Sequence, residues 1–192
     1  MTTPIYFIDG KVIADSNDIV VYEMDGVRYL EQGPGHSLWA DSEEIEQLSE
    51  QINGAPRGNC LEIGLGLGVA SEYILSKPKV NSLTTVELSS DVIYVYYELN
   101  KKDDRHTIIC QNGLDYMLET DKKFDFVFLD MYSCIDEDTL PEIKSYVNAS
   151  KNILNDGGEV MGWFDPSTPI ELAKEFFGYF GTMYIGDIHE IF

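Results

Sequence analysis

Short apolar runs separated by Asp-Gly pairs fill the first thirty residues of the chain. In residues 5–30 the pairs Asp9-Gly10 and Asp25-Gly26 are each flanked by β-branched, aromatic or other apolar side chains. This is a strong signal for two-residue hairpin turns. A loop rich in Gly and Pro follows at 31–37. The pattern predicts a small N-terminal β-hairpin segment over residues 1–37.

The spacing then becomes helical. Ile45, Leu48 and Ile52 recur on one face of residues 41–52, and acidic residues come early in this stretch. The pattern predicts an amphipathic helix with Asp41 or Ser42 as its N-cap.

From residue 59 onward, apolar runs alternate with amphipathic stretches. Strands are predicted at 59–65, 82–88, 106–111, 124–131 and 159–164, helices at 69–76, 91–100, 114–119, 139–154 and 170–180, a turn at 156–158 and a last strand or hairpin at 182–192. Such alternation implies parallel strands joined by crossover helices. The predicted fold class is therefore α/β: a Rossmann-like, doubly wound, mostly parallel sheet over residues 38–192.

Composition narrows the classes of function. The chain has 13 Lys and Arg against 34 Asp and Glu, a formal net charge of −21. This charge disfavours nucleic acid and favours a cationic small molecule, although it could also serve solubility alone. Three cysteines without a pairing pattern argue against a disulfide framework, and the residues show no zinc-ligand spacing. With no signal-peptide pattern and no apolar stretch of the ~18 residues that a span needs, we expect a cytoplasmic protein without a membrane partner.

Three glycines follow the first predicted strand. Gly64, Gly66 and Gly68 lie in the sequence LEIGLGLG and precede a predicted helix. Glycine lets the backbone turn tightly and approach a ligand without an intervening Cβ. Glu87 ends the second strand about twenty residues later, where an acidic residue meets the ribose hydroxyls of a nucleoside cofactor.

Polar residues also end the next two predicted strands. Asn112 and Gly113 follow the third strand, and Asp130 ends the fourth. The carboxyl ends of parallel strands share one edge of the sheet, and ligands bind at that edge. The sequence therefore predicts a nucleoside-cofactor site there, the alternative being that these side chains are solvated strand ends.

Residues 61–163 resemble class I S-adenosylmethionine-dependent methyltransferases, whose glycine motif also follows an acidic residue, here Glu62. The resemblance implies that Gly64 and Gly66 approach the methionine part, that Glu87 holds the ribose, and that Asn112 and Leu114 flank the adenine. Many members have Asp in place of Asn112. The cofactor-binding residues implied are Glu62, Gly64, Gly66, Gly68, Glu87, Leu88, Asn112, Gly113, Leu114 and Asp130.

Within that family, the chain is similar to spermidine synthases. They carry an N-terminal β segment with a turn like MDGVRYLEQ, a VE pair ending the second strand, and an Asp ending the fourth. The chain departs from them at Leu67, where they have an acidic residue. It also departs at Ser133 and Cys134, where they have a second Asp followed by Pro.

The chain also resembles guanidinoacetate N-methyltransferase. The shared features are LEIGLGLG, a Trp ahead of an acidic helix (Trp39), and Asp130 with Tyr132 after the fourth strand. In that enzyme the strand-four Asp grips the guanidinium and accepts its proton, which implies Asp130 and Tyr132 as catalytic residues here. Ala40 stands where that enzyme has a Glu next to the Trp, and Asp41 or Glu43 could take the role of that Glu.

Together these features predict an S-adenosylmethionine-dependent methyltransferase that acts on a small, cationic amine or guanidine. Two alternatives stay open: aminopropyl transfer of the spermidine synthase type, and binding of the cofactor without turnover. No metal is expected, because the methyl donor is already activated. A homodimer is an open expectation, and so are contacts of His36, Trp39 and Asp41 with the substrate.

Overall fold

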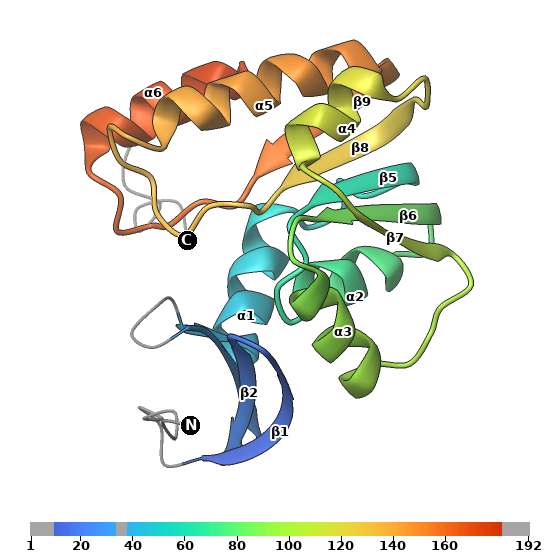
Figure 1. Ribbon diagram of the computed structural model, residues 1–192. Coiled ribbons are helices and arrows are strands. Elements are labelled where there is room, and N and C mark those ends of the chain that lie inside the picture. The colour runs from blue at the N-terminus through green and yellow to red at the C-terminus, as the bar shows by residue number, and fades with distance from the viewer. Residues whose placement is uncertain (1–9, 34–37, 182–192) are drawn as a thin grey trace.

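A computed structural model describes residues 10–33 and 38–181, and in the segment 38–46 it describes the side chain of Ile45 alone. Two sheets make up the structure: a four-stranded antiparallel sheet near the N-terminus and a five-stranded parallel sheet (Figure 1). The predicted α/β class is confirmed. Within this part of the chain no helix is both long and apolar enough to cross a bilayer.

The N-terminal sheet runs in the order β1 (Lys11–Ser16), β2 (Ile19–Met24), β3 (Val27–Gln32) and β4 (Leu38–Ala40). The predicted turn at Asp25-Gly26 is confirmed: both residues have positive φ, 54° and 82°, as a two-residue hairpin of this kind requires. A second tight turn, at Asn17-Asp18, joins β1 to β2 and was not predicted. Gly10 directly precedes β1, and residues 1–9, which include the other predicted turn residue, lie outside the described part.

The parallel sheet has the order β7-β6-β5-β8-β9, with β5 (Gly58–Ile63) in the centre. The other strands are β6 (Val80–Glu87), β7 (His106–Cys110), β8 (Phe124–Leu129) and β9 (Leu154–Gly162). The helices are α1 (Asp41–Gln51), α2 (Val69–Leu75), α3 (Ser90–Leu99), α4 (Gly113–Glu119), α5 (Leu140–Ile153) and α6 (Ile170–Phe180). The strands are added on one side of β5 as far as β7 and then on the other side from β8 onward, so the switch point where ligands bind in this architecture lies between β5 and β8.

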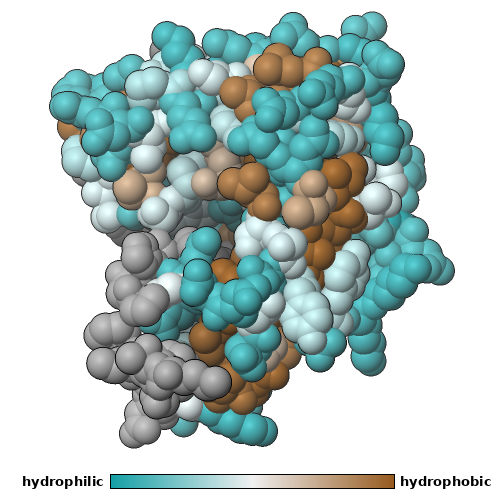
Figure 2. All heavy atoms as spheres, in the orientation of Figure 1, coloured by the Kyte–Doolittle hydropathy of each residue, from teal (hydrophilic) through white to brown (hydrophobic). Residues whose placement is uncertain are grey.

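The two faces of the parallel sheet carry separate cores. Alternate residues of β5 and β8 point to opposite faces: Cys60, Phe126 and Phe128 join one cluster with α1, α2 and α3, while Leu61, Val127 and Leu129 join the other with α4, α5 and α6. Figure 1 shows these two helical layers. Figure 2 shows that the outer surface of the α5 and α6 layer is mostly hydrophilic, as the acidic composition requires.

One predicted boundary differs in the structure. The sequence predicts a helix to residue 154 and a turn at 156–158 before the last strand. In the structure α5 ends at Ile153 and β9 begins at Leu154, with an irregular register between the pairs Phe124↔Leu154 and Phe126↔Glu159. Gly157, at φ 76°, absorbs this irregularity inside the strand. The predicted strand at 182–192 lies outside the described residues.

The N-terminal sheet packs against α3. Ser16 and Asn17 donate side-chain hydrogen bonds of 2.6 and 2.7 Å to one carboxylate oxygen of Asp91. This contact brings the end of β3 over the carboxyl edge of the parallel sheet. β4 extends the same sheet past residue 37, and the division of the chain at 37/38 stays a prediction.

Candidate functional site

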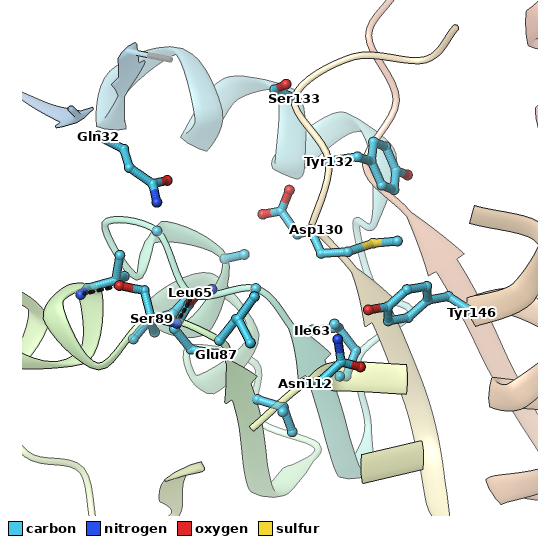
Figure 3. Close-up of a pocket in the computed structure, with 18 of the residues that line it drawn as sticks. Gln32, Ile63, Leu65, Glu87, Ser89, Asn112, Asp130, Tyr132, Ser133 and Tyr146 are labelled. Carbon is cyan, nitrogen blue, oxygen red and sulfur yellow. Dashed lines mark hydrogen bonds between the residues drawn. The ribbon is translucent and has the colours of Figure 1, made fainter. Parts of the chain in front are cut away.

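A cavity of about 440 Å³ opens at the carboxyl ends of β5, β6, β7 and β8. Figure 3 shows its residues arranged around one open centre. The lining residues are Leu30, Gln32, Ile63, Gly64, Leu65, Gly66, Ala70, Val86, Glu87, Leu88, Ser89, Val92, Asn112, Gly113, Asp130, Met131, Tyr132, Ser133, Glu142 and Tyr146. The structure thus brings the polar ends of four successive strands together.

The glycines of LEIGLGLG serve three different local needs. Gly64 has φ 95°, and a Cβ there would lie 2.0 Å from the backbone oxygen of Asp130. Gly66 has φ 50° and nothing within 4 Å of the position of a Cβ, so its backbone is open. Gly68 has φ 82° and caps α2, and a Cβ would lie 2.2 Å from the ring of Tyr96. Of these three glycines, all of which the structure describes, Gly64 and Gly66 line the cavity and Gly68 does not.

Glu87 ties the glycine loop to the start of α3. One carboxylate oxygen accepts a hydrogen bond from the backbone N–H of Leu65 at 2.9 Å, and the other from Ser89 at 2.7 Å. Each oxygen keeps a lone pair for a further donor. Leu88, which is 70% exposed, extends over the cavity beside it.

Asn112 and Gly113 form the cavity wall after β7. The side-chain oxygen of Asn112 accepts hydrogen bonds from the backbone N–H groups of Leu114 and Asp115 at 2.9 and 3.1 Å, which caps α4. Gly113 lines the cavity, whereas Leu114 packs against the α4–α6 core and does not line it. The predicted contact of Leu114 with a base therefore has no support in this geometry.

Asp130 points its carboxylate into the centre of the cavity (Figure 3). Its backbone N–H donates to Ile63, 2.8 Å away, which continues the pairing of β8 with β5. The carboxylate accepts no hydrogen bond from the described residues, and loss of water around it raises its pKa from 3.8 to about 7. Asp130 is thus a partly desolvated acid with room for a partner.

The ionisable side chains of the cavity are acidic. Glu87, Asp130 and Glu142 contribute carboxylates, and the described lining contains no Lys, Arg or His. Like charges around one space disfavour an anion and favour a cation or a hydrogen-bond donor. The described residues include no group of three or more side chains that could hold a metal ion.

Two predicted site residues have other roles. The hydroxyl of Tyr132 donates to the backbone oxygen of Trp163 at 2.6 Å, on the side away from the Asp130 carboxylate (Figure 3). Its ring packs against Trp163 and Phe176. This hydroxyl fastens the segment after β8 to the residue after β9, and a catalytic role of Tyr132 stays a prediction.

Glu62 also lies away from the cavity. It is fully buried beneath the glycine loop, where it accepts hydrogen bonds from Ser71 and Thr85. Burial raises its pKa to about 8, although both hydrogen bonds act in the opposite direction. Thr85 also contacts His106 at 2.8 Å, and burial lowers the pKa of that imidazole to about 4. Glu62 therefore belongs to a buried polar network that supports the loop rather than to the ligand surface.

Sequence reasoning missed several lining residues. Gln32 reaches over the cavity from the end of β3, while Glu142 and Tyr146 reach it from α5 (Figure 3 labels Gln32 and Tyr146). Gln32 ends the segment MDGVRYLEQ, and its position after the hairpin was the one indication in the sequence that it could reach the site. Glu142 and Tyr146 are four residues apart on one helix, and only the packing of α5 shows which face they occupy. His36 lies outside the described residues, as do the side chains of Trp39 and Asp41.

Comparison with known proteins agrees with this geometry. The chain superposes on spermidine synthase from Thermotoga maritima with a TM-score of 0.70 and 17% identity, over 90% of this chain and 64% of that one. The chain has the fold of spermidine synthase. It superposes on the N-methyltransferase NodS from Bradyrhizobium japonicum with a TM-score of 0.54 and 16% identity, over 72% of this chain and 81% of that one. The predicted resemblance to the class I fold and to spermidine synthase is confirmed.

Sequence comparison also finds a relative among curated proteins. A polyamine aminopropyltransferase from Saccharolobus islandicus is 27% identical over 115 residues, which is 55% of this chain. The chain spans only 38% of that relative's length. No family model matches the chain. The closer likeness to guanidinoacetate N-methyltransferase stays a prediction.

Proposed function

We propose that this chain binds S-adenosylmethionine in the described cavity and transfers its methyl group to a small cationic amine or guanidine. The observation that carries the proposal is the carboxylate of Asp130, which accepts no hydrogen bond from the described residues, has a pKa raised to about 7, and faces an acidic cavity beside the glycine loop. The likeness in fold to an N-methyltransferase supports methyl transfer.

The residues present fit a sulfonium nucleoside. The backbone at Gly66 is open to a close approach, and the lining offers carboxylates to a cation. Glu87 keeps lone pairs for two ribose hydroxyls while its present hydrogen bonds hold the loop. When bound, S-adenosylmethionine supplies a methyl group that is already activated by the positive sulfur.

In this proposal Asp130 binds the acceptor and accepts its proton. Its carboxylate holds an ammonium or guanidinium group by a charge-assisted hydrogen bond and so aligns the acceptor nitrogen. Before it can attack carbon, the acceptor nitrogen must give up one proton so that its lone pair is free, and a carboxylate with a pKa near 7 is matched to take that proton near neutral pH. The bond from sulfur to the methyl carbon would break as the bond from nitrogen forms, and the neutral thioether would leave. Ile63 and Val86 are buried apolar residues of the cavity wall, and they limit the access of water that would compete for hydrogen bonds with the acceptor.

Aminopropyl transfer is the second candidate. The curated relative is an aminopropyltransferase, and the likeness to spermidine synthase extends over 90% of the chain. Against it stands Leu67, which occupies the place of an acidic residue, is 3% exposed and packs in the α1–α3 core. Ser133, a cavity residue without a charge, occupies the place of a second Asp. A diamine acceptor would lack these two charge partners.

Calorimetry and product analysis test the proposal. The chain is titrated with S-adenosylmethionine, decarboxylated S-adenosylmethionine and S-adenosylhomocysteine, and is then incubated with amines, guanidines and polyamines. Methyl transfer releases S-adenosylhomocysteine, whereas aminopropyl transfer releases 5′-methylthioadenosine. Release of S-adenosylhomocysteine is expected. Release of only 5′-methylthioadenosine supports the second candidate, binding without any turnover supports a non-catalytic protein, and failure of all three nucleosides to bind removes the site itself.

A further inference from the structure

The wall of the cavity after β7 presents a hydrogen-bond donor. Asn112 turns its side-chain oxygen toward the backbone N–H groups of Leu114 and Asp115, at 2.9 and 3.1 Å. Those two donors fix the orientation of the amide, because the opposite orientation would set N–H against N–H. The amide nitrogen is left on the cavity side (Figure 3) and has no hydrogen-bond partner in the described part of the chain.

Tyr146 adds a second donor at the same wall. It lines the cavity, its side chain is buried, and Figure 3 shows its hydroxyl directed toward Asn112 and the cavity. The backbone N–H of Leu114, which donates to Asn112, also lies beside this hydroxyl. Among the described residues the hydroxyl is not seen to donate a hydrogen bond, so its proton is available to a ligand.

Gly113 lets neighbouring side chains pack closely at this wall. A Cβ at Gly113 would lie 2.5 Å from Ile63 and 3.1 Å from the ring of Tyr146. The absence of that atom lets the side chains of Ile63 and Tyr146 pack closely on the backbone beside Asn112, so an apolar side chain and two hydrogen-bond donors share one wall of the cavity. Apolar surface next to a few directed polar groups suits a heterocyclic base.

We infer that the chain recognises the nucleoside base through hydrogen-bond acceptors on the base and not through a 6-amino group; this inference rests on the proposed function. A carboxylate at position 112 would accept from the 6-amino group of adenine and would reject a 6-oxo group by repulsion between acceptors. The amide nitrogen of Asn112 can donate to a ring nitrogen or to a 6-oxo oxygen. The chain should therefore tolerate hypoxanthine in place of adenine.

Glu142 is the residue that could produce the opposite behaviour. It lies one helical turn before Tyr146 on α5, lines the cavity and carries a carboxylate that could accept from a 6-amino group. The experiment must separate its contribution from that of Asn112.

The test compares S-adenosylhomocysteine with S-inosylhomocysteine by calorimetry on the full chain. The parent should bind the two ligands with affinities within about threefold of each other. Asn112→Asp should favour the adenosyl ligand by about tenfold or more, because the new carboxylate accepts from the amino group and repels the oxo group. Aspartate caps a helix as well as asparagine does, so this variant should fold, and a thermal melt checks that it does. Tyr146→Phe should weaken both ligands without changing their ratio.

Three results would overturn the inference. One is a parent that favours the adenosyl ligand by more than about tenfold. Another is an unchanged ratio in folded Asn112→Asp. The third is an adenosyl preference that disappears in Glu142→Gln, which would assign base recognition to Glu142. If S-adenosylhomocysteine binds but the ratio of the two affinities differs from the expected one, only this inference falls. If neither ligand binds, the proposed function falls with it.

Discussion

Asp130 combines partial burial with a carboxylate that accepts no hydrogen bond from the described residues. The sequence placed this residue at the end of an apolar strand, and that pattern alone predicted partial desolvation. The structure adds what a single strand cannot reveal: the backbone oxygen of Asp130 sits where a side chain at Gly64 would be. The acid and the glycine loop are therefore held by one backbone contact. The orientation of Tyr132 was beyond sequence analysis, because its partner, the backbone oxygen of Trp163, follows β9 and lies 31 residues away along the chain.

Asp130→Asn should separate transfer from nucleoside binding. The substitution keeps the shape of the side chain and removes its charge and basicity, so kcat/KM for the acceptor should fall by about 10²-fold or more. The affinity for S-adenosylhomocysteine should change by less than about tenfold. Steady-state kinetics with the acceptor found in the screen, together with calorimetry, gives both numbers. Transfer at the parent rate would remove Asp130 from the reaction.

The same variant should be more stable than the parent at alkaline pH. The pKa of Asp130 is raised from 3.8 to about 7, so the folded chain holds the proton more tightly than the unfolded chain. The stability that this proton provides is complete below about pH 4 and is lost as the pH rises through about 7. At pH 8 the free energy of unfolding of Asp130→Asn should exceed the parent's by about 1–3 kcal/mol, since the carboxylate borders an open cavity and is only partly desolvated. Urea unfolding at pH 4 and pH 8 measures this, and an equal difference at both values would contradict it.

At the scale of elements, the strand–helix alternation from residue 59 onward and the Asp25-Gly26 hairpin were predictable because each rests on local periodicity or turn chemistry. The turn at Asn17-Asp18 and the start of β9 were not, since Asp-Gly was the stronger local signal and the β9 irregularity depends on pairing with β8. Gln32 joined the cavity only through the packing of the N-terminal sheet on α3.

Gly66→Val should abolish nucleoside binding without unfolding the chain. Gly66 has φ 50°, which a β-branched residue resists, and its open position faces the cavity. Calorimetry with S-adenosylhomocysteine should show no measurable heat of binding in a variant whose circular dichroism matches the parent. Gly26→Val serves as the control: its φ is also positive and its Cβ position is also open, but it lies in the distant β2–β3 turn. Binding retained by folded Gly66→Val would make the loop a structural turn alone.

Glu87→Ala should weaken nucleoside binding through the loop as well as through the ribose. The carboxylate joins Leu65 to Ser89, so its removal frees the glycine loop from the start of α3. We expect a loss of about 1.5–3 kcal/mol in the binding of S-adenosylhomocysteine, the range for charge-assisted hydrogen bonds. The 2′-deoxy analogue distinguishes the two effects, because a ribose contact predicts a smaller loss for that ligand. An unchanged affinity in calorimetry would exclude Glu87 from the site.

The excess of acidic residues in the whole molecule extends to the lining of the cavity. A formal charge of −21 surrounds a site whose described ionisable lining is carboxylate. The sequence allowed two interpretations of this charge, solubility or attraction of a cation, and only the three-dimensional placement of Glu87, Asp130 and Glu142 favours the second.

Salt should therefore weaken the binding of the acceptor more than the binding of the nucleoside. Between 0.05 and 0.5 M NaCl, KM for a cationic acceptor should rise by roughly 3–10-fold, because screening reduces the attraction of the surrounding acidic groups. The affinity for S-adenosylhomocysteine, which has no net charge, should change by less than about twofold over the same range. Initial rates and calorimetry at matched ionic strengths provide the comparison. Equal sensitivity of both ligands would show that the net charge serves solubility only.

The strand order has a consequence for the way in which the chain acquires its fold during synthesis. β5, which leads into the glycine loop, pairs on one side with β6 and on the other with β8, where Cys60 lies opposite Phe126. A nascent chain that ends before Phe124 therefore leaves the central strand with one open, strongly apolar edge. Such an edge is a template for pairing with another chain. The segment that delivers Asp130 to the site is thus also the segment that protects β5 from aggregation.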